Sequence, residues 1–128
     1  MSYYLARTVS VTFDEAITRV TAALKQEGFG VLTDIDVQAT LKAKLGVDTP
    51  KYRILGACNP GFAHQALQLE NKLGVLLPCN VIVRQADDGQ TEIAAIDPVS
   101  SMERTGNPKL ASVADEVRAR LQRAVDNV

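Results

Sequence analysis

The chain has 128 residues, of which 46% are hydrophobic and 5% aromatic, and its formal charge is -1. This length fits one domain whose core needs no disulfide or metal, and the charge argues against a nucleic-acid or membrane surface that works mainly by electrostatics. The first residues carry no basic segment that leads into an apolar run, so we expect no signal peptide, and no run of roughly 18 apolar residues predicts a membrane span. We therefore expect one cytoplasmic domain over residues 1–128, with no nucleic-acid or membrane partner.

The first third of the chain predicts a strand, a long helix and a second strand. Residues 3–11 alternate between apolar and polar side chains, as a strand with one buried face does. Thr12 and Glu15 have the spacing of a reciprocal capping box, and Gly28 supplies the left-handed residue that ends the helix. Residues 29–35 are rich in β-branched side chains and predict the second strand. The apolar face of the helix carries Phe13, Ala16, Ile17, Val20 and Leu24.

The middle of the chain predicts a short helix, a third strand and another helix. Asp36 can cap a short helix that runs through Leu45. Residues 52–58 predict a strand, and the Asn-Pro pair at 59–60 is typical of a helix start. We expect the helix that follows to end at Gly74. The expected apolar stripes are Val37, Leu41 and Leu45 on the short helix, and Phe62, Ala66, Leu69 and Leu73 on the next one.

The last third predicts a strand pair, a polar loop and a final helix. A strand begins at residue 75, is interrupted by Pro78 because proline cannot donate to a ladder, and resumes over 81–84. A turn at 87–89 joins it to a hairpin partner over 91–96. Residues 97–106 predict a polar loop long enough to suggest a function. A second Asn-Pro pair starts the last helix, whose stripe is Leu110, Val113, Ala114, Val117, Leu121 and Val125.

This order of elements predicts an α+β fold, because the hairpin near the end argues against a purely parallel sheet. Helices packed on one face of a largely antiparallel sheet fit it better. The other face is then either exposed to solvent or buried in an oligomer. Tyr52, Ile54 and Val81 are too apolar for a wholly solvated face, so we expect a dimer.

Several segments together resemble a known prokaryotic family, the domain of unknown function 302. They are GFGVLT at 28–33, IDV at 35–37, ATLK at 39–42, YRILGACNP at 52–60, LPCNV at 77–81 and DP at 97–98. The resemblance covers nearly the whole chain, and the two Cys-Asn segments are its most specific part. It implies a TATA-binding-protein-like arrangement, with one curved, mostly antiparallel sheet of about five strands backed by helices, and a homodimer. It implies no activity and no catalytic residue, and the likeness of the fold to a DNA-binding protein is analogy alone.

The two cysteines carry the sharpest local feature of the sequence. Cys58 precedes a helix N-terminus, where the dipole and free amides favour a thiolate, and Cys79 follows the proline that interrupts its strand. One hypothesis makes them a redox pair or part of a metal site. The alternative is two small buried thiols that fill space where a helix meets the sheet. Asn59 and Asn80 follow the two cysteines and are candidate ligand-binding residues with them.

The other candidate residues are single polar or charged side chains. His64, the one histidine, lies off the apolar stripe of its helix, and the chain has no paired metal-ligand spacing, so we expect neither a metal nor another cofactor. Lys42, Lys44 and Arg53 could gather around an anion, although lysines on a short helix usually form a solvated face. Asp97 could act at the polar loop, although Asp-Pro is more typical of a turn or cap.

Three functional hypotheses remain open from the sequence. The first is a module that binds a small molecule, anionic in one version, in a cleft between helix and sheet near Cys58, His64 and Cys79. The second is a thiol-dependent redox or metal-handling protein. The third is an assembly protein whose sheet face is its interface. No motif in the sequence assigns a reaction, so whether the protein is an enzyme stays open.

Overall fold

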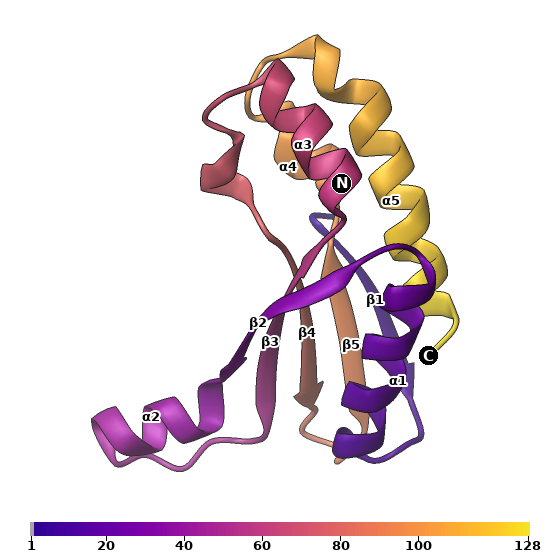
Figure 1. Cartoon of the computed structure of the whole chain (residues 1–128). Helices are drawn as coiled ribbons and strands as arrows, with labels where there is room; N and C mark the ends of the chain where they lie inside the picture. The colour runs from indigo at the N-terminus through magenta and orange to yellow at the C-terminus, as the bar shows by residue number, and fades with distance from the viewer. Residues whose placement is uncertain (1) are drawn as a thin grey trace.

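The structure is a computed structural model, and it describes residues 2–128. Its centre is one curved sheet with the strand order β1-β5-β4-β3-β2, in which every neighbouring pair is antiparallel (Figure 1). The strands are β1 (Tyr4–Val9), β2 (Gly30–Asp36), β3 (Tyr52–Cys58), β4 (Cys79–Gln85) and β5 (Thr91–Ile96). The predicted α+β class, with about five mostly antiparallel strands, is confirmed.

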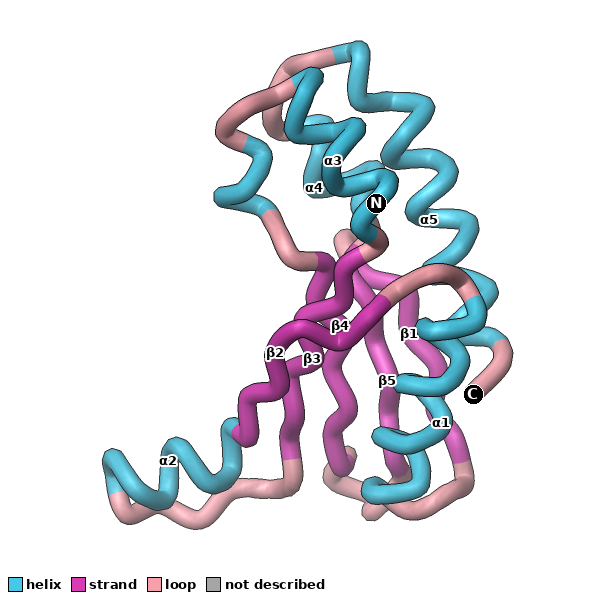
Figure 2. The backbone as a smooth tube through the Cα atoms, in the orientation of Figure 1, coloured by secondary structure: helices cyan, strands magenta, loops and turns pink. Residues whose placement is uncertain are grey.

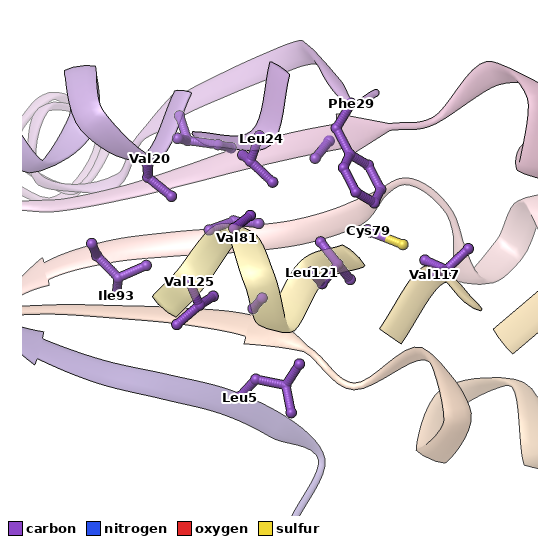
Figure 3. Packing of buried hydrophobic residues seen from close by; sticks show 14 of the residues in the cluster. Leu5, Val20, Leu24, Phe29, Cys79, Val81, Ile93, Val117, Leu121 and Val125 are labelled. Carbon is purple, nitrogen blue, oxygen red and sulfur yellow. The ribbon is translucent and has the colours of Figure 1, made fainter. Parts of the chain in front are cut away.

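Two helices, α1 (Phe13–Gln26) and α5 (Ala111–Asp126), pack on one face of this sheet (Figures 1 and 2). Side chains on a strand alternate between faces, so every second residue of β4 and β5 is buried under these helices. Figure 3 shows Leu121 of α5 and Leu24 of α1 packed close to Val81. Each such fully buried side chain contributes about 1.5–3 kcal/mol of transfer free energy. The predicted stripe of the last helix is confirmed, since all six of its residues are buried.

The predicted ends of α1 are largely confirmed. Thr12 Oγ1 accepts a hydrogen bond from the amide of Glu15 at 3.2 Å. The prediction that the Glu15 carboxylate bonds back to the start of the helix was wrong, because this carboxylate instead accepts a hydrogen bond from Arg19 Nε at 3.0 Å. At the other end, Gly28 has a φ of 87°, and the Phe29 amide donates back to the Leu24 carbonyl at 2.9 Å. This is the Schellman ending that the sequence predicts.

The remaining segments lie beyond the two ends of the strands. At one end, α3 (Pro60–Leu69) and α4 (Pro98–Glu103) pack with the first half of α5 and with two short 3₁₀ segments, η1 (Leu73–Leu76) and η2 (Pro108–Leu110). At the other end, α2 (Val37–Leu45) projects away from α1 and α5 at the tip of the β2–β3 hairpin (Figure 1). The fold therefore has a sheet layer, a helix layer and a helical cluster over one end of the sheet.

The prediction of a polar loop over residues 97–106 was wrong, because most of this segment is helix α4. Asp97 caps this helix by accepting a hydrogen bond from the Val99 amide at 3.0 Å, and Pro98 takes the first helical position. The segment ends at Gly106, whose φ of 69° is left-handed. An Asp-Pro pair therefore starts a helix here, with the proline at the first helical position as in the Asn-Pro pair before α3, whereas the Asn-Pro pair at 107–108 starts η2 and α5 begins at Ala111.

The region between α3 and β4 also differs from the prediction. Helix α3 ends at Leu69 rather than at Gly74, because Glu70 is extended, with a φ of -146°. Asn107 Nδ2 donates to the free carbonyl of Leu69 at 2.9 Å and so satisfies one group of the helix end. Residues 75–77 do not begin the fourth strand. They belong to or follow η1, and β4 begins at Cys79, directly after the proline.

The apolar stripe predicted on α2 is present in the sequence but is not buried. None of the nine residues of α2, all of them described, is buried, and Leu45 keeps 69% of its surface exposed. The predicted boundaries of this helix are confirmed. Asp36 Oδ1 accepts from the Ala39 amide at 2.9 Å, and Gly46 ends the helix with a φ of 69°. α2 is therefore a well-capped helix whose apolar side chains contact little within one copy of the chain.

The face of the sheet opposite α1 and α5 carries no covering helix within the described residues, and we call it the bare face. Strand alternation and register assign its members. Val81 was expected among the residues at risk of exposure but is fully buried in the core, whereas Tyr52 and Ile54 are half-buried on the bare face. The bare face consists of Tyr4, Ala6, Thr8, Thr33, Ile35, Tyr52, Ile54, Gly56, Asn80, Ile82, Arg84, Glu92, Ala94 and Ile96.

Within residues 2–128, none of the helices combines the length and the apolar character that a membrane crossing needs.

Candidate functional site

A cavity lies where helix α3 meets the end of the sheet, and we call it the α3 cavity. Its volume is about 320 Å³. The cavity is partly open to solvent, and its volume is at the small end of the range of ligand pockets. Its walls come from β2, β3, α3, the segment before β4, α4 and α5. They are formed by Phe29, Leu32, Ala57, Cys58, Asn59, Phe62, Ala63, Ala66, Leu67, Leu77, Pro78, Cys79, Met102, Val113 and Val117.

Helix α3 forms one wall of the cavity, and polar contacts at its start hold it in place. Pro60 occupies the first helical position, and Asn59 precedes it. Asn59 does not cap the helix with its side chain. Its Nδ2 instead donates to the carbonyl of Glu27, at the end of α1, at 3.3 Å. Arg120 of α5 donates to the same carbonyl at 3.2 Å and lies over the Phe62 ring, 5.1 Å from its centroid. Three helices are thereby joined beside the cavity.

Both cysteines line the α3 cavity, but their environments differ. Cys79 is buried, and Figure 3 shows its sulfur among the side chains of the core. Burial, and secondarily the neighbouring Cys58, raise the pKa of the Cys79 thiol to about 11. Cys79 lies opposite Ala57 in the β3–β4 register, one residue away from Cys58, which is half-buried. At neutral pH Cys79 is a protonated thiol, and this counts against a nucleophilic or redox role for it.

The chemistry of the cavity wall is apolar. None of the described residues that line it is charged, and apart from the two thiols its polar side chain is that of Asn59. An ion would lose its hydration in such a site without gaining a partner charge, which is unfavourable. Among residues 2–128 there is also no group of three or more His, Cys, Asp or Glu side chains arranged to hold a metal ion. The arrangement suits a small, uncharged or weakly polar molecule.

The charged residues expected to gather around an anion are instead engaged in separate ion pairs. Arg53 forms a bidentate pair with Asp34 of the neighbouring strand, and the hydrogen bond from Arg53 lowers the pKa of the Asp34 carboxyl. Lys42 pairs with Asp48 at 2.9 Å. Lys44 is exposed on α2, and none of these cations lines the α3 cavity.

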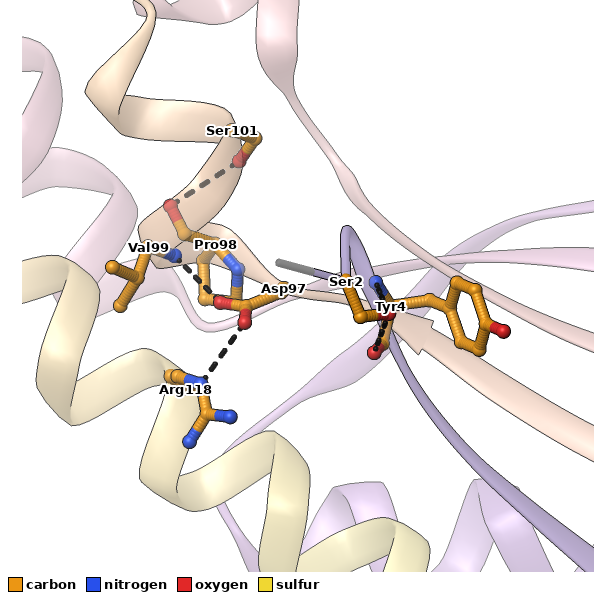
Figure 4. A network of polar contacts seen from close by, with 7 residues as sticks. All are labelled: Ser2, Tyr4, Asp97, Pro98, Val99, Ser101 and Arg118. Atoms are coloured by element: carbon orange, nitrogen blue, oxygen red, sulfur yellow. Dashed lines mark hydrogen bonds and ion pairs between the residues drawn. The ribbon is translucent and has the colours of Figure 1, made fainter.

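Asp97 has a structural environment. The residue is only 5% exposed, and its carboxylate accepts hydrogen bonds from the Val99 amide and from Arg118 Nε, the latter at 3.1 Å (Figure 4). These contacts fix the start of α4 against α5. The carboxylate is therefore used as a cap and an anchor, which matches the turn-or-cap interpretation of the Asp-Pro pair.

The last two candidates lie outside the α3 cavity. His64 is exposed on α3 and does not line the cavity. Asn80 points to the bare face, where it borders a second, shallower hollow of about 630 Å³. Of the nine candidate residues, the structure thus brings together Cys58, Asn59 and Cys79.

Sequence reasoning missed several cavity residues because it placed them in other elements. Met102 was assigned to a polar loop, although the Asp-Pro helix start could have placed it on a helix. Leu32 was assigned to a regular strand. It is the extra residue of a β-bulge between Val31 and Thr33, and no local pattern announces that bulge. Leu77 was assigned to a strand and not to the connection that closes the cavity.

The comparisons with known proteins agree with this architecture. A family model described as domain of unknown function DUF302 matches residues 5–128. A crystal structure of an uncharacterized conserved protein DUF302 from Bacillus stearothermophilus is similar, with a TM-score of 0.93 and 33% sequence identity over 99% of this chain and 98% of that one. The comparison with curated proteins gives no match. The family model and the structural relative both span almost the whole chain, and the chain therefore belongs to the DUF302 family.

Proposed function

We propose that this protein binds a small, largely apolar molecule in the α3 cavity. The observation that carries the proposal is the cavity itself, which is preformed, about 320 Å³ in volume and lined almost entirely by carbon and sulfur. Ligand pockets usually measure about 300–1,000 Å³, so this one is at the small end. At roughly 30 Å³ for each water-sized group, it accommodates about ten non-hydrogen atoms.

The lining favours a neutral ligand over the anionic one that the sequence left open. Arg120 lies over the ring of Phe62, a wall residue, but its guanidinium already bonds to Glu116 and to the Glu27 carbonyl. A weakly polar end of the ligand has Asn59 and the half-buried Cys58 as neighbours. A medium-length alcohol or a single aromatic ring has the matching size and polarity.

The test is a comparison of 1-octanol with octanoate by thermal shift and calorimetry. These molecules match in length and differ in charge. We expect octanol to stabilise the protein and octanoate to do so less, because the cavity offers the carboxylate no partner charge. Ala63→Leu, on the cavity wall, should abolish the octanol response. Gln65→Leu adds a similar side chain to an exposed position of the same helix and should leave the response unchanged. An equal response in both variants would overturn the proposal.

We further propose that the protein is a homodimer that associates through the bare face. The supporting observation is the apolar centre of that face, where Ile54, Ile82, Ala94 and Ile96 lie under no helix of the described chain. Monomeric proteins rarely leave a contiguous apolar patch of several hundred Å² in water. Sedimentation velocity of the full chain at micromolar concentration tests this, and a monomer throughout that range would contradict it.

A cytoplasmic location is also part of the proposal. It is supported by the two cysteines, both free thiols, which is the usual state in a reducing compartment. Fractionation of cells that express the protein is the corresponding test, and recovery outside the cytoplasm would contradict it.

A further inference from the structure

The β2–β3 hairpin tip forms an arm that packs only partly against the rest of its own chain. The arm, residues 37–50, contains helix α2 and the turn after it. An isolated helix of nine residues is marginal in water, because too few hydrogen bonds offset the cost of nucleation. Yet both ends of α2 are capped, and two apolar side chains of the arm, Leu45 at the end of α2 and Val47 in the turn after it, remain 69% and 43% exposed. The sequence thus specifies a helix for which a single copy of the chain provides little to pack against.

The charges of the bare face suit contact with a second copy of the chain. In a twofold interface the same patch meets itself, so a patch of one sign would repel. Among the described residues of the bare face, the charged ones are Arg84 and Glu92, and they pair with each other across β4 and β5 at 2.7 Å. The net charge of the face is therefore zero. The half-buried Tyr52 and Ile82 border the 630 Å³ hollow at its centre.

The area of the bare face indicates what else the interface needs. Five strands spaced about 4.8 Å apart, each about 20 Å long, give a face of roughly 500 Å². A stable interface buries about 800 Å² on each partner. In a twofold dimer each copy contributes one arm and receives another, and a nine-residue helix about 13 Å long and 10 Å wide covers on the order of 130 Å². Only the contributed arm adds to the total, because the received arm covers part of the bare face that is already counted, and the buried area then rises to roughly 630 Å² on each copy.

We propose that in the dimer the arm of each copy packs against the bare face of the other, with Leu45 and Val47 covering part of its apolar surface. The inference rests on the self-association proposed above. It adds that the arm of each copy forms part of the interface, and it accounts for the exposed apolar side chains of the arm.

Three variants of the full chain separate the possible outcomes. Ile82→Glu places a charge at the centre of the bare face, Leu45→Glu places one on the arm, and Val75→Glu is the matched control, because Val75 is 86% exposed on η1, outside both surfaces. We expect wild type and Val75→Glu to sediment as dimers and Ile82→Glu as a monomer. Leu45→Glu should weaken the dimer by at least about tenfold, since it replaces one buried apolar side chain by a charge. Circular dichroism checks that each variant folds.

Cross-linking tests the arm directly and does not depend on how well a charged variant folds. In a Cys58→Ser background, an equimolar mixture of Leu45→Cys and Ile82→Cys chains should form mixed disulfides on mild oxidation. A mixture of Val75→Cys and Ile82→Cys chains should not. A wild-type monomer would overturn both the dimer and the arm contact. The arm contact would be overturned, and the dimer retained, if Ile82→Glu disrupted the dimer while Leu45→Glu did not weaken it and the Leu45→Cys and Ile82→Cys mixture formed no mixed disulfide.

Discussion

Gly56 lies where β2, β3 and the proline before β4 converge, and replacing it with alanine should destabilise the fold. A Cβ atom at this position would lie 2.1 Å from Thr33 Oγ1 and 2.8 Å from Pro78 Cγ. Ordinary contacts begin at about 3.4 Å, so one of the neighbours must move by more than 1 Å. Thr33 is β-branched and stiff, and the ring of Pro78 is rigid. We therefore expect Gly56→Ala to cost about 2–3 kcal/mol, the upper part of the range for overpacked sites.

Gly30→Ala is the matched control, because it lies on the neighbouring strand and a Cβ there meets nothing within 4 Å. It should be neutral or stabilising by up to about 1 kcal/mol, since alanine loses less backbone entropy than glycine on folding. Urea denaturation measures both variants, and Gly56→Ala should lower the midpoint by roughly 1 M. Thr33→Ala in the Gly56→Ala background should recover part of the loss, because the contact with Pro78 remains. If both glycine variants were equally stable, the steric argument would be refuted.

Three further predictions concern the core and the titrating groups. Leu121→Ala should cost about 2–5 kcal/mol by denaturant titration, because this leucine is fully buried, and a loss below 1 kcal/mol would contradict the packing. Burial and the proximity of Cys58 raise the pKa of the Cys79 thiol to about 11. From about pH 9 to 11 the unfolded chain therefore releases this proton while the folded chain keeps it, and the free energy of unfolding should fall with rising pH. Cys79→Ala should flatten that part of the stability profile. The hydrogen bond from Arg53 lowers the pKa of Asp34, so its carboxyl should titrate by NMR below 3.8, and the midpoint should rise in Arg53→Met, whereas an unchanged midpoint would exclude the pair in solution.

The elements that could be predicted from the sequence are those whose boundaries are set by local chemistry. Thr12 and Gly28 determine α1 through contacts within a few residues, and the same holds for Asp36 and Gly46 at α2. The core stripe of α5 follows from helical periodicity alone. Such signals depend only on neighbouring residues, so one sequence is sufficient to find them.

The elements that could not be predicted depend on contacts between distant segments. Helix α3 ends early where Asn107, 38 residues away, donates to the Leu69 carbonyl. The α3 cavity could be foreseen only as a cleft near Cys58 and Cys79, because its walls come from six separate segments. Lys42 and Arg53 were grouped as a possible anion site, yet each has a carboxylate partner, Asp48 and Asp34, that sequence spacing does not identify.

The β-bulge at Leu32 has a consequence for how this fold can change. The extra residue of β2 has no partner of its own on β3 there. Odd-numbered residues of β2 therefore face the helices before the bulge and the bare face after it. Leu32 itself and Phe29, just before the strand, line the α3 cavity, and Thr33 and Ile35 after the bulge contribute to the bare face. Deleting Leu32 would restore a regular ladder in which Val31 still lies opposite Ala57 and Thr33 opposite Gly56, so the other residues of β2 would keep their faces. The bulge thus adds one residue to the cavity wall without changing the register of β2 on either side, so the cavity wall can change there while the bare face keeps its members.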